Sequence, residues 1–158
     1  MTLSDFQVVV LTVDNRQLAD EFAEKMFDNV MFTHFRHTSP CDMLDPEKWS
    51  VWMLCKDEAC LGWMQAQLFR GVKAHVSRLG LALVPELRGH GLGTEMIKFM
   101  VDNLNDKDKL TASAFSDNVA CLRAFKTNGF TSEGTFFDEE RWPVIGSRSV
   151  VSLARFKA

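Results

Sequence analysis

Hydrophobic and polar residues alternate with different periods along the chain, and each period predicts a different element. The β-branched run FQVVVL, residues 6–11, predicts a first strand. Asp14 is the predicted N-cap of a helix, because an apolar stripe follows it at every fourth position: Leu18, Phe22, Met26 and Val30. Residues 31–48 mix aromatic, histidine, proline and charged residues without a clear period. They predict a short helix and a loop, an irregular segment suited to substrate contacts.

The middle of the chain predicts a hairpin, a buried strand and a helix. Two apolar runs, WSVWMLC and CLGWMQAQLF, flank the polar turn KDEA, which is typical of a hairpin. The run HVSRLGLALV, residues 75–84, is almost continuously apolar, as expected for a strand covered on both faces. A glycine loop then leads from Pro85 into a helix starting near Thr94. Its buried face is predicted to comprise Met96, Ile97, Met100, Val101 and Leu104.

The last third of the chain predicts a strand, a helix and two final strands. KLTASAF, residues 109–115, is the strand. The helix lies in SDNVACLRAFKTNGF, with Asp117 or Asn118 as its cap and Gly129 as a left-handed residue after its end. Residues 130–142 and 148–156 are the final strands, around a turn at Pro143 and Gly146. This element order predicts one mixed α/β domain spanning residues 1–158, a length suited to a single core.

Composition and charge limit the classes of partner that this protein is expected to bind. The chain is 46% hydrophobic and 25% charged, as in ordinary globular domains. Its formal net charge is −3, and lysine and arginine are scattered, so we expect no nucleic-acid partner. No basic region precedes the first apolar run, and no stretch reaches the roughly 20 apolar residues of a membrane span. We therefore expect a cytoplasmic protein without a membrane partner.

Cysteine and histidine spacing gives no metal site. The four cysteines, at positions 41, 55, 60 and 121, contain no CxxC pair, and we expect reduced thiols in the core. His34 and His37 would share one helix face, but no third ligand accompanies them. We predict no bound metal.

The glycine loop VPELRGHGLGTEM, residues 84–96, carries the clearest candidate chemistry. A P-loop is excluded because Gly93 is followed by Thr94 where a lysine is required. The dinucleotide fingerprint is excluded because Thr94 and Met96 occupy the two possible places of its third glycine. The pattern R-x-x-G-x-G remains, formed by Arg88, Gly91 and Gly93. Its amides, at a helix N-terminus, can surround an anion such as pyrophosphate. The alternative is a tight turn that only packs the helix.

A second motif, downstream of the glycine loop, helps to interpret the loop. NVACLRAFKTNGF, residues 118–130, has asparagine at a helix start, an aromatic residue seven positions later and Gly-Phe at its end. With the glycine loop, it resembles the GNAT superfamily of acyl-CoA N-acyltransferases, whose members carry V-x-P-x-x-R-G-x-G-x-G and N-x-x-A-x-x-x-Y-x-x-x-G-F. The resemblance covers residues 6–156. It implies a splayed mixed sheet of about six to seven strands flanked by about four helices. Acetyl-CoA would lie in a cleft between the strands near 77–84 and 109–115.

The resemblance also implies roles for individual residues. The pantetheine arm would pair with the backbone of Leu81, Leu83 and Val84. An amide near Leu83 would point at the thioester oxygen, where charge grows in the transition state. Asn118 would contact the pantetheine arm or a water near the thiol. The pyrophosphate would be held beside Arg88 by the amides of Gly89, His90, Gly91, Leu92, Gly93 and Thr94.

One departure from the family pattern concerns the general acid. The tyrosine that protonates the leaving thiolate in many relatives is replaced by Phe125, and the chain contains no tyrosine. A positioned acid contributes roughly 10²- to 10⁴-fold, so its loss matters without abolishing turnover. Cys121, Ser116 or a water on Asn118 could supply the proton instead.

The general base is also open. Relatives place a glutamate at positions that align with Ser77 and Ser113, and neither serine is a useful base. The other candidates are His75, the predicted substrate-binding residue His34 with its neighbour His37, and the acidic group Asp138, Glu139 and Glu140. Each has a plain alternative, a surface histidine or a solvated turn. If Glu139 and its neighbours border the cleft, they would favour a cationic amine.

The sequence therefore predicts an acetyl-CoA-dependent N-acetyltransferase that acts by direct attack of a primary amine on the thioester. The acceptor would be a small molecule or a peptide. The alternative is a catalytically weak acyl-CoA-binding sensor or regulatory module of the same fold, motivated by Phe125 and the absent glutamate. We expect a homodimer, paired through sheet edges or C-terminal strands.

Overall fold

The computed structural model describes residues 1–27, 43–142 and 146–157. These residues form seven strands and three α-helices, with short 3-10 helices between them. The elements are β1 Gln7–Val10, α1 Arg16–Phe27, β2 Trp49–Lys56, β3 Ala59–Leu68, β4 Val76–Leu83, α2 Leu92–Asn103, β5 Lys109–Phe115, α3 Val119–Thr127, β6 Thr131–Trp142 and β7 Gly146–Phe156. The predicted mixed α/β sheet is confirmed. The short helix predicted within residues 31–48 falls largely outside the described residues, and the described part has three α-helices rather than about four.

The strands form one sheet in the order β1-β2-β3-β4-β5-β7-β6. Every neighbouring pair is antiparallel except β4 and β5, which are parallel. A parallel pair needs a crossover connection, and α2 lies within it. The glycine loop therefore joins the end of a central strand to its crossover helix.

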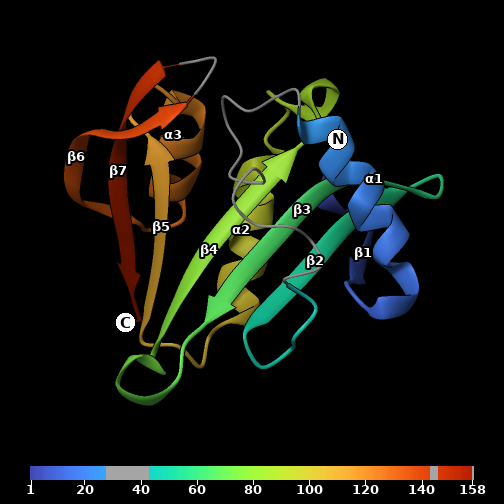
Figure 1. The fold of residues 1–158 in the computed structure, drawn as a ribbon, viewed down its shortest axis with the longest axis horizontal. Helices are drawn as coiled ribbons and strands as arrows, with labels where there is room; N and C mark the ends of the chain where they lie inside the picture. Colours follow the sequence, from blue (N-terminus) through green and yellow to red (C-terminus); the bar gives the residue numbers. More distant parts are fainter. Residues whose placement is uncertain (28–42, 143–145, 158) are drawn as a thin grey trace.

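The sheet divides between β4 and β5. Their register covers only Val76–Arg78 on β4 and Lys109–Thr111 on β5. Beyond these residues the two strands separate, and Figure 1 shows the two parts of the sheet diverging from this point. The predicted splay of the sheet is confirmed. It opens beside the part of β4 that pairs with β3 but no longer with β5.

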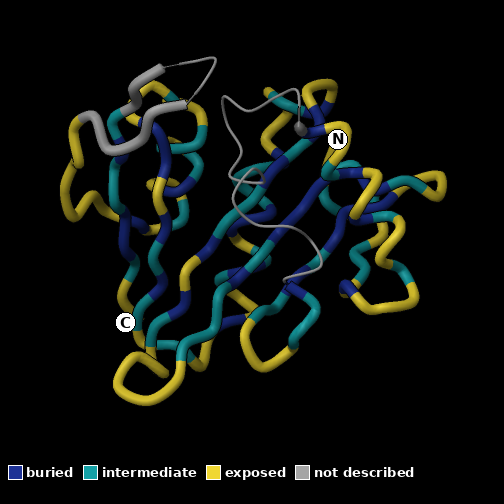
Figure 2. Tube along the Cα trace, viewed as in Figure 1, coloured by how far each residue is buried: buried dark blue, intermediate teal, exposed yellow. Residues whose placement is uncertain are grey.

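Two hydrophobic clusters cover the two faces of the sheet. On one face Phe22 and Met26 of α1 pack against β2 and β3, and the ring of Phe22 stacks on Trp63 with centroids 6.1 Å apart. On the other face α2 and α3 pack together, and the fully buried residues Met96 and Phe125 belong to this second cluster. Figure 2 shows burial concentrated along the central strands. The apolar stripes predicted for α1 and α2 therefore belong to the core where the structure describes them, and Val30 lies outside the described residues.

Helix boundaries differ from the prediction at one cap. The chain enters α1 through a 3-10 turn, Val13–Asn15, and the amide of Thr12 donates to the Asn15 side chain at 2.8 Å. Asp14 lies inside this turn, so its prediction as the N-cap was wrong. Gly129 adopts φ +85° after α3, as predicted.

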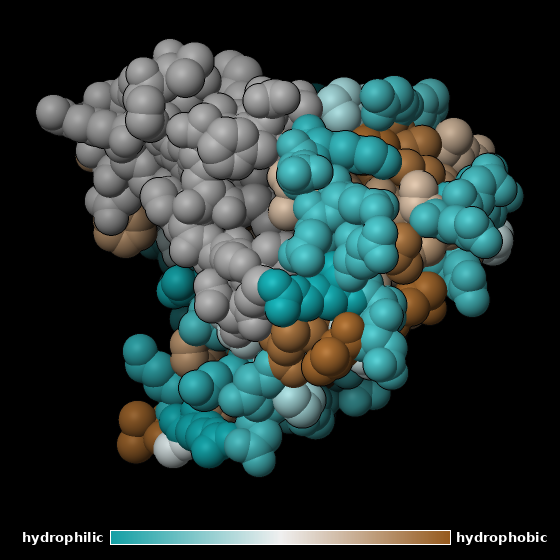
Figure 3. Space-filling view, turned by 45° about the vertical axis from the view of Figure 1, so that its right-hand side comes forward, coloured by the Kyte–Doolittle hydropathy of each residue, from teal (hydrophilic) through white to brown (hydrophobic). Residues whose placement is uncertain are grey.

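The surface shown in Figure 3, on the α1 side of the molecule, is mainly hydrophilic with separate hydrophobic patches. Among the described helices none combines the length and apolar character needed to cross a membrane. Cys55 and Cys60 are buried free thiols opposite each other on β2 and β3. Burial raises the pKa of Cys60 to about 12, so this thiol stays protonated near neutral pH.

Candidate functional site

A cleft with a cavity volume of about 230 Å³ lies where β4 and β5 separate. Its lining comes from both faces of the sheet and from α3. On the α1 face it is lined by Trp49, Gln65, Gln67, Arg78, Gly80, Ser113 and Phe115, and on the α3 side by Leu79, Leu81, Ala114, Asn118, Cys121 and Phe125. The cleft thus connects the two faces through the split in the sheet, so two molecules can approach one point from opposite sides.

The backbone of β4 presents free groups to this cleft. Successive strand residues direct their amides and carbonyls to opposite sides. The amide of Val84 donates to the Leu61 carbonyl at 3.0 Å, which sets the even-numbered residues toward β3. Leu81 and Leu83 therefore face the side on which β5 has diverged. An extended ligand can add to β4 there as an extra strand.

Val84 differs from the other two residues predicted to pair with such a ligand. Its amide is occupied by Leu61, and its carbonyl accepts from the amide of Leu87 at 3.1 Å. A backbone group that already has a partner contributes little to binding a new one. Leu81 fits the predicted role, and Val84 does not. Leu83 fits it through its amide alone, because its carbonyl accepts from the Arg88 Nε at 3.2 Å.

The loop after β4 arranges its amides around a helix terminus. A short 3-10 helix, Pro85–Leu87, ends the strand, and Gly89 and Gly91 then adopt φ of +79° and +82°. Gly91 is the N-cap of α2. Among the described residues, none accepts a hydrogen bond from the six amides of residues 89–94. Free donors at the positive end of a helix form a site for an anion.

Arg88 braces this loop. Its Nε donates to the Leu83 carbonyl at 3.2 Å, which links the loop to the end of β4. Burial lowers the pKa of the Arg88 guanidinium, an effect opposed by the nearby Glu86 carboxylate. The guanidinium therefore holds the glycine loop in place as well as adding positive charge beside it.

Two asparagines connect the two sequence motifs in space. The side chain of Asn118 caps α3 by accepting from the Cys121 amide at 3.2 Å, and its amide nitrogen is available to the cleft. Asn128, at the other end of α3, donates to the carbonyls of Thr94 at 3.0 Å and Ala124 at 2.9 Å. Asn128 thus fixes the start of α2 against α3. Sequence analysis placed it inside the motif but gave it no role.

Phe125 and Cys121 form the apolar end of the cleft. Phe125 is 1% exposed and meets Phe130 edge to face, with centroids 5.0 Å apart. Burial raises the pKa of Cys121 to about 11. The structure thus places an aromatic ring without a hydroxyl, and a weakly acidic thiol, beside Asn118.

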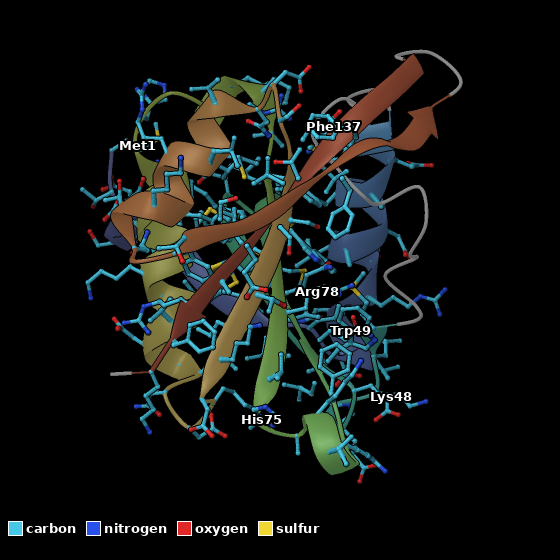
Figure 4. The ribbon with its side chains drawn as sticks, turned by 90° about the vertical axis from the view of Figure 1, so that its left-hand side faces the viewer. Met1, Lys48, Trp49, His75, Arg78 and Phe137 are labelled. Atoms are coloured by element: carbon cyan, nitrogen blue, oxygen red, sulfur yellow. The ribbon has the colours of Figure 1, made fainter. Side chains whose placement is uncertain are left out.

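The wall of the cleft opposite Phe125 and Cys121 is polar, and no sequence motif predicted it. Gln65 and Gln67 project from β3, and Arg78 lies opposite Gln67 in the β3–β4 register. Figure 4 shows Arg78 close to Trp49, with His75 farther along, near the closed end of the split. The polar alternation of Gln65 and Gln67 in an apolar strand was the available signal. A strand buried on both faces would not carry it.

The structure constrains the candidate bases. His75 does not line the cleft, and its carbonyl accepts from the amides of Asp108 and Lys109 where β4 and β5 meet. Ser77 is fully buried and donates to the Gln67 carbonyl at 2.7 Å. Ser113 is in the lining but has no base strength. His34 and His37 lie outside the described residues, as do the side chains of Asp138, Glu139 and Glu140.

The described residues contain no group of three or more histidine, cysteine, aspartate or glutamate side chains arranged to hold a metal ion. The groups that the described site offers are strand amides, helix-terminal amides, and a polar and an apolar wall. Such donors fit a long, extended ligand with an anionic group near one end.

Comparison with known proteins agrees with this geometry. A family model described as the acetyltransferase (GNAT) family matches residues 12–130. No curated protein matches the chain. The match includes β4 and α3, which contribute to the cleft lining, and the glycine loop that follows β4.

Solved structures show the same fold at low sequence identity. An acetyltransferase of the GNAT family from Streptococcus pneumoniae superposes with a TM-score of 0.83 at 10% identity, covering 96% of this chain and 99% of the other. A ribosomal-protein-alanine N-acetyltransferase from Brucella melitensis gives 0.75 at 14% identity, with 95% and 99% covered. A variant of the spermidine N-acetyltransferase from Vibrio cholerae gives 0.76 at 10% identity, with 96% and 95% covered. Because these names specify different acceptors, the fold alone does not select the acceptor.

Proposed function

The chain belongs to the GNAT acetyltransferase family, and from this premise we propose that it transfers an acetyl group from acetyl-CoA to a primary amine. The observation that carries the proposal is the cleft at the β4–β5 split, with free strand amides along one edge and free helix-terminal amides at one end. Its cytoplasmic location and a homodimeric assembly stay predictions from the sequence.

Binding of the cosubstrate is assigned to two sets of backbone groups. The amides of residues 89–94 would hold the diphosphate, with Arg88 bracing the loop. Leu81 and Leu83 would pair with the pantetheine arm, and the free amide nitrogen of Asn118 would face its far end. Because the strand edge and the loop are continuous in the chain, one extended molecule can occupy both.

We also propose a position for the reacting carbon, and the cavity lining supports it. The lining includes Leu81 but not Leu83. We therefore assign the amide of Leu81 to the thioester oxygen and the amide of Leu83, first expected there, to the pantetheine arm. An amide fixed in a strand stabilises the charge that develops on this oxygen without reorganisation.

The chemical step joins an amine nitrogen to the thioester carbon. The C–N bond forms and the C–S bond breaks, a proton leaves the amine nitrogen, and the departing sulfur takes up a proton. Phe125 cannot provide that proton. Transfer from Cys121, whose pKa is about 11, to a thiolate whose conjugate acid has a pKa of about 8.5 is uphill by roughly 3 kcal/mol. We assign to a water held by Asn118 the role of a relay, which passes the proton that leaves the amine nitrogen to the departing sulfur.

Free-thiol release from acetyl-CoA, measured over a panel of amines, peptides and amino sugars, tests the function. Thiol release that depends on both the amine and the enzyme, with acetylated amine identified by mass, supports the proposal. Tight CoA binding without thiol release across the panel would instead favour the alternative, an acyl-CoA-binding module.

A further inference from the structure

We propose that the amine acceptor also carries a carboxylate, and that Arg78 binds it at the α1 face of the cleft. The inference rests on the proposed function and adds a substrate class to it. It comes from the polar wall of the cleft, formed by Trp49, Gln65, Gln67 and Arg78.

Arg78 is a cation without a described carboxylate partner. It is exposed, it lies on β4 opposite Gln67, and its parallel neighbour on β5 is Thr111. Two acidic residues in the adjoining segments pair with other cations: Glu47 with Arg70, and Glu133 with Lys109 at 2.7 Å. A guanidinium held in a cleft without a protein anion is suited to an anion from the ligand, which it can bind through two parallel hydrogen bonds.

Gln65 adds a second donor to the same wall. Its Oε1 accepts from the Trp63 indole nitrogen at 2.9 Å, so its NH₂ group is the end left for a ligand. The side chain lies across β4 over Gly80, where an added Cβ would meet the Gln65 Nε2 at 3.1 Å. Glycine at position 80 therefore makes room for this side chain. The fixed orientation turns an amide that can donate or accept into a donor.

The charge of the described lining favours an anion over a cation. It contains Arg78 and no aspartate or glutamate. A second ammonium group on the acceptor would meet a guanidinium at this wall, with no described carboxylate to offset the repulsion. A carboxylate meets the Arg78 guanidinium and the Gln65 NH₂ group, so we choose the carboxylate.

The span between the two groups is compatible with a small molecule or a short peptide. Arg78 and Leu81 are three residues apart on one strand, about 10 Å at a rise of roughly 3.3 Å per residue. The arginine side chain shortens this distance. An acceptor with several bonds between its amine and its carboxylate can reach the thioester and the guanidinium together.

Matched acceptors test the inference. One set is a dipeptide ending in a carboxylate, a carboxamide or a quaternary ammonium group. A second set is a straight-chain primary amine with the same three endings. Thiol release with wild type should give the highest kcat/KM for the carboxylate member, and Arg78→Gln should reduce that preference by about 10- to 100-fold, mainly through KM. Arg78→Lys should restore part of it.

Arg16→Gln is the control, because it removes the same charge from an exposed site on α1, where Arg16 pairs with Asp20. It should leave the preference unchanged. If amines react but the carboxylate members have no advantage, or if Arg78→Gln preserves the advantage, the inference is wrong and the acetyltransferase stands. If no amine in a broad panel releases thiol, the function is wrong and the inference falls with it.

Discussion

Two glycines provide a matched test of the anion-binding loop. Gly91 caps α2 with φ +82°, and Gly71 lies in a turn outside the cleft with φ +64°. An added Cβ meets nothing within 4 Å at either position. Both are exposed. Replacing each by alanine therefore imposes the same kind of backbone strain and no steric clash in the free protein, and the two positions differ only in the proposed contact with the diphosphate.

The magnitudes follow from the backbone conformation. A left-handed alanine costs about 1–2 kcal/mol, so Gly71→Ala and Gly91→Ala should lower the free energy of unfolding by similar amounts. In the complex, the methyl group of Gly91→Ala would stand where backbone amides approach the diphosphate. Loss of one hydrogen bond to a charged acceptor is worth about 1.5–3 kcal/mol, which is about a 10- to 150-fold weaker Kd.

Calorimetric titration with CoA and urea unfolding measure the two effects separately. Gly91→Ala should lose both stability and CoA affinity, and Gly71→Ala should lose stability alone. Gly93→Ala is a third arm, because position 93 is helical and its Cβ would make only an ordinary 3.9 Å contact with Leu81. It should gain up to about 1 kcal/mol of stability. Unchanged CoA affinity in Gly91→Ala, or an equal loss in Gly71→Ala, would refute the assignment of the loop.

Four further measurements test other parts of the site. If protonation of the leaving thiolate limits the rate, Phe125→Tyr should raise kcat by up to about 10²-fold. An unchanged or lower kcat in a correctly folded variant would show that this protonation does not limit the rate. Asn128→Ala removes one hydrogen bond from the end of α3 to α2 and one within α3, and should cost about 1–3 kcal/mol in urea unfolding and weaken CoA binding. Full affinity would show that the link to α2 does not position the loop. Burial raises the pKa of Cys60 to about 12 and that of Cys121 to about 11, so the folded state holds these protons more tightly than the unfolded state. Their contribution to the free energy of unfolding is therefore complete below pH 9 and is lost as the pH rises toward 11–12. Cys121→Ala should flatten this loss, and a pH profile identical to that of wild type would argue against it. Glu139→Gln should raise KM for a cationic acceptor and leave CoA affinity unchanged if the acidic turn borders the cleft, whereas an unchanged KM would exclude that role.

The fold was predictable where local patterns and tertiary packing agree. The strand predicted at residues 109–115 matches β5 at both ends, because apolar alternation and flanking polar residues both mark it. The entry to α1 was mispredicted, since Asp14 has the composition of a cap but the Thr12–Asn15 turn takes that place. The turn of the β2–β3 hairpin contains Asp57 and Glu58 at positive φ, a conformation that their sequence signals only weakly.

The cosubstrate half of the site was more predictable than the acceptor half. A loop that binds an anion through its backbone amides can be recognised from consecutive residues, because its geometry requires glycine at fixed spacings. The acceptor wall is assembled by sheet register: Gln65 and Arg78 are distant in sequence and adjacent only through the pairing of β3 with β4. No local sequence motif indicates that these two residues are neighbours, so the hydrogen-bond donors on this wall could be identified only from the structure.

The chemistry of the described cleft also bears on the pKa of the acceptor amine. The lining between β4 and β5 supplies hydrogen-bond donors but, among its described residues, no carboxylate or imidazole that could accept a proton. Where no such group takes up its proton, an amine reacts largely from its own neutral fraction. At pH 7 a lysine-type amine with a pKa of about 10.4 is only about 0.04% neutral, whereas an α-amine with a pKa of about 8 is roughly one-tenth neutral. This difference of more than two orders of magnitude exceeds the contribution of many single hydrogen bonds, so a cleft of this kind favours an α-amine. Combined with a carboxylate at Arg78, that preference describes a molecule with an amino terminus at one end and a carboxylate several bonds away, as in a short peptide.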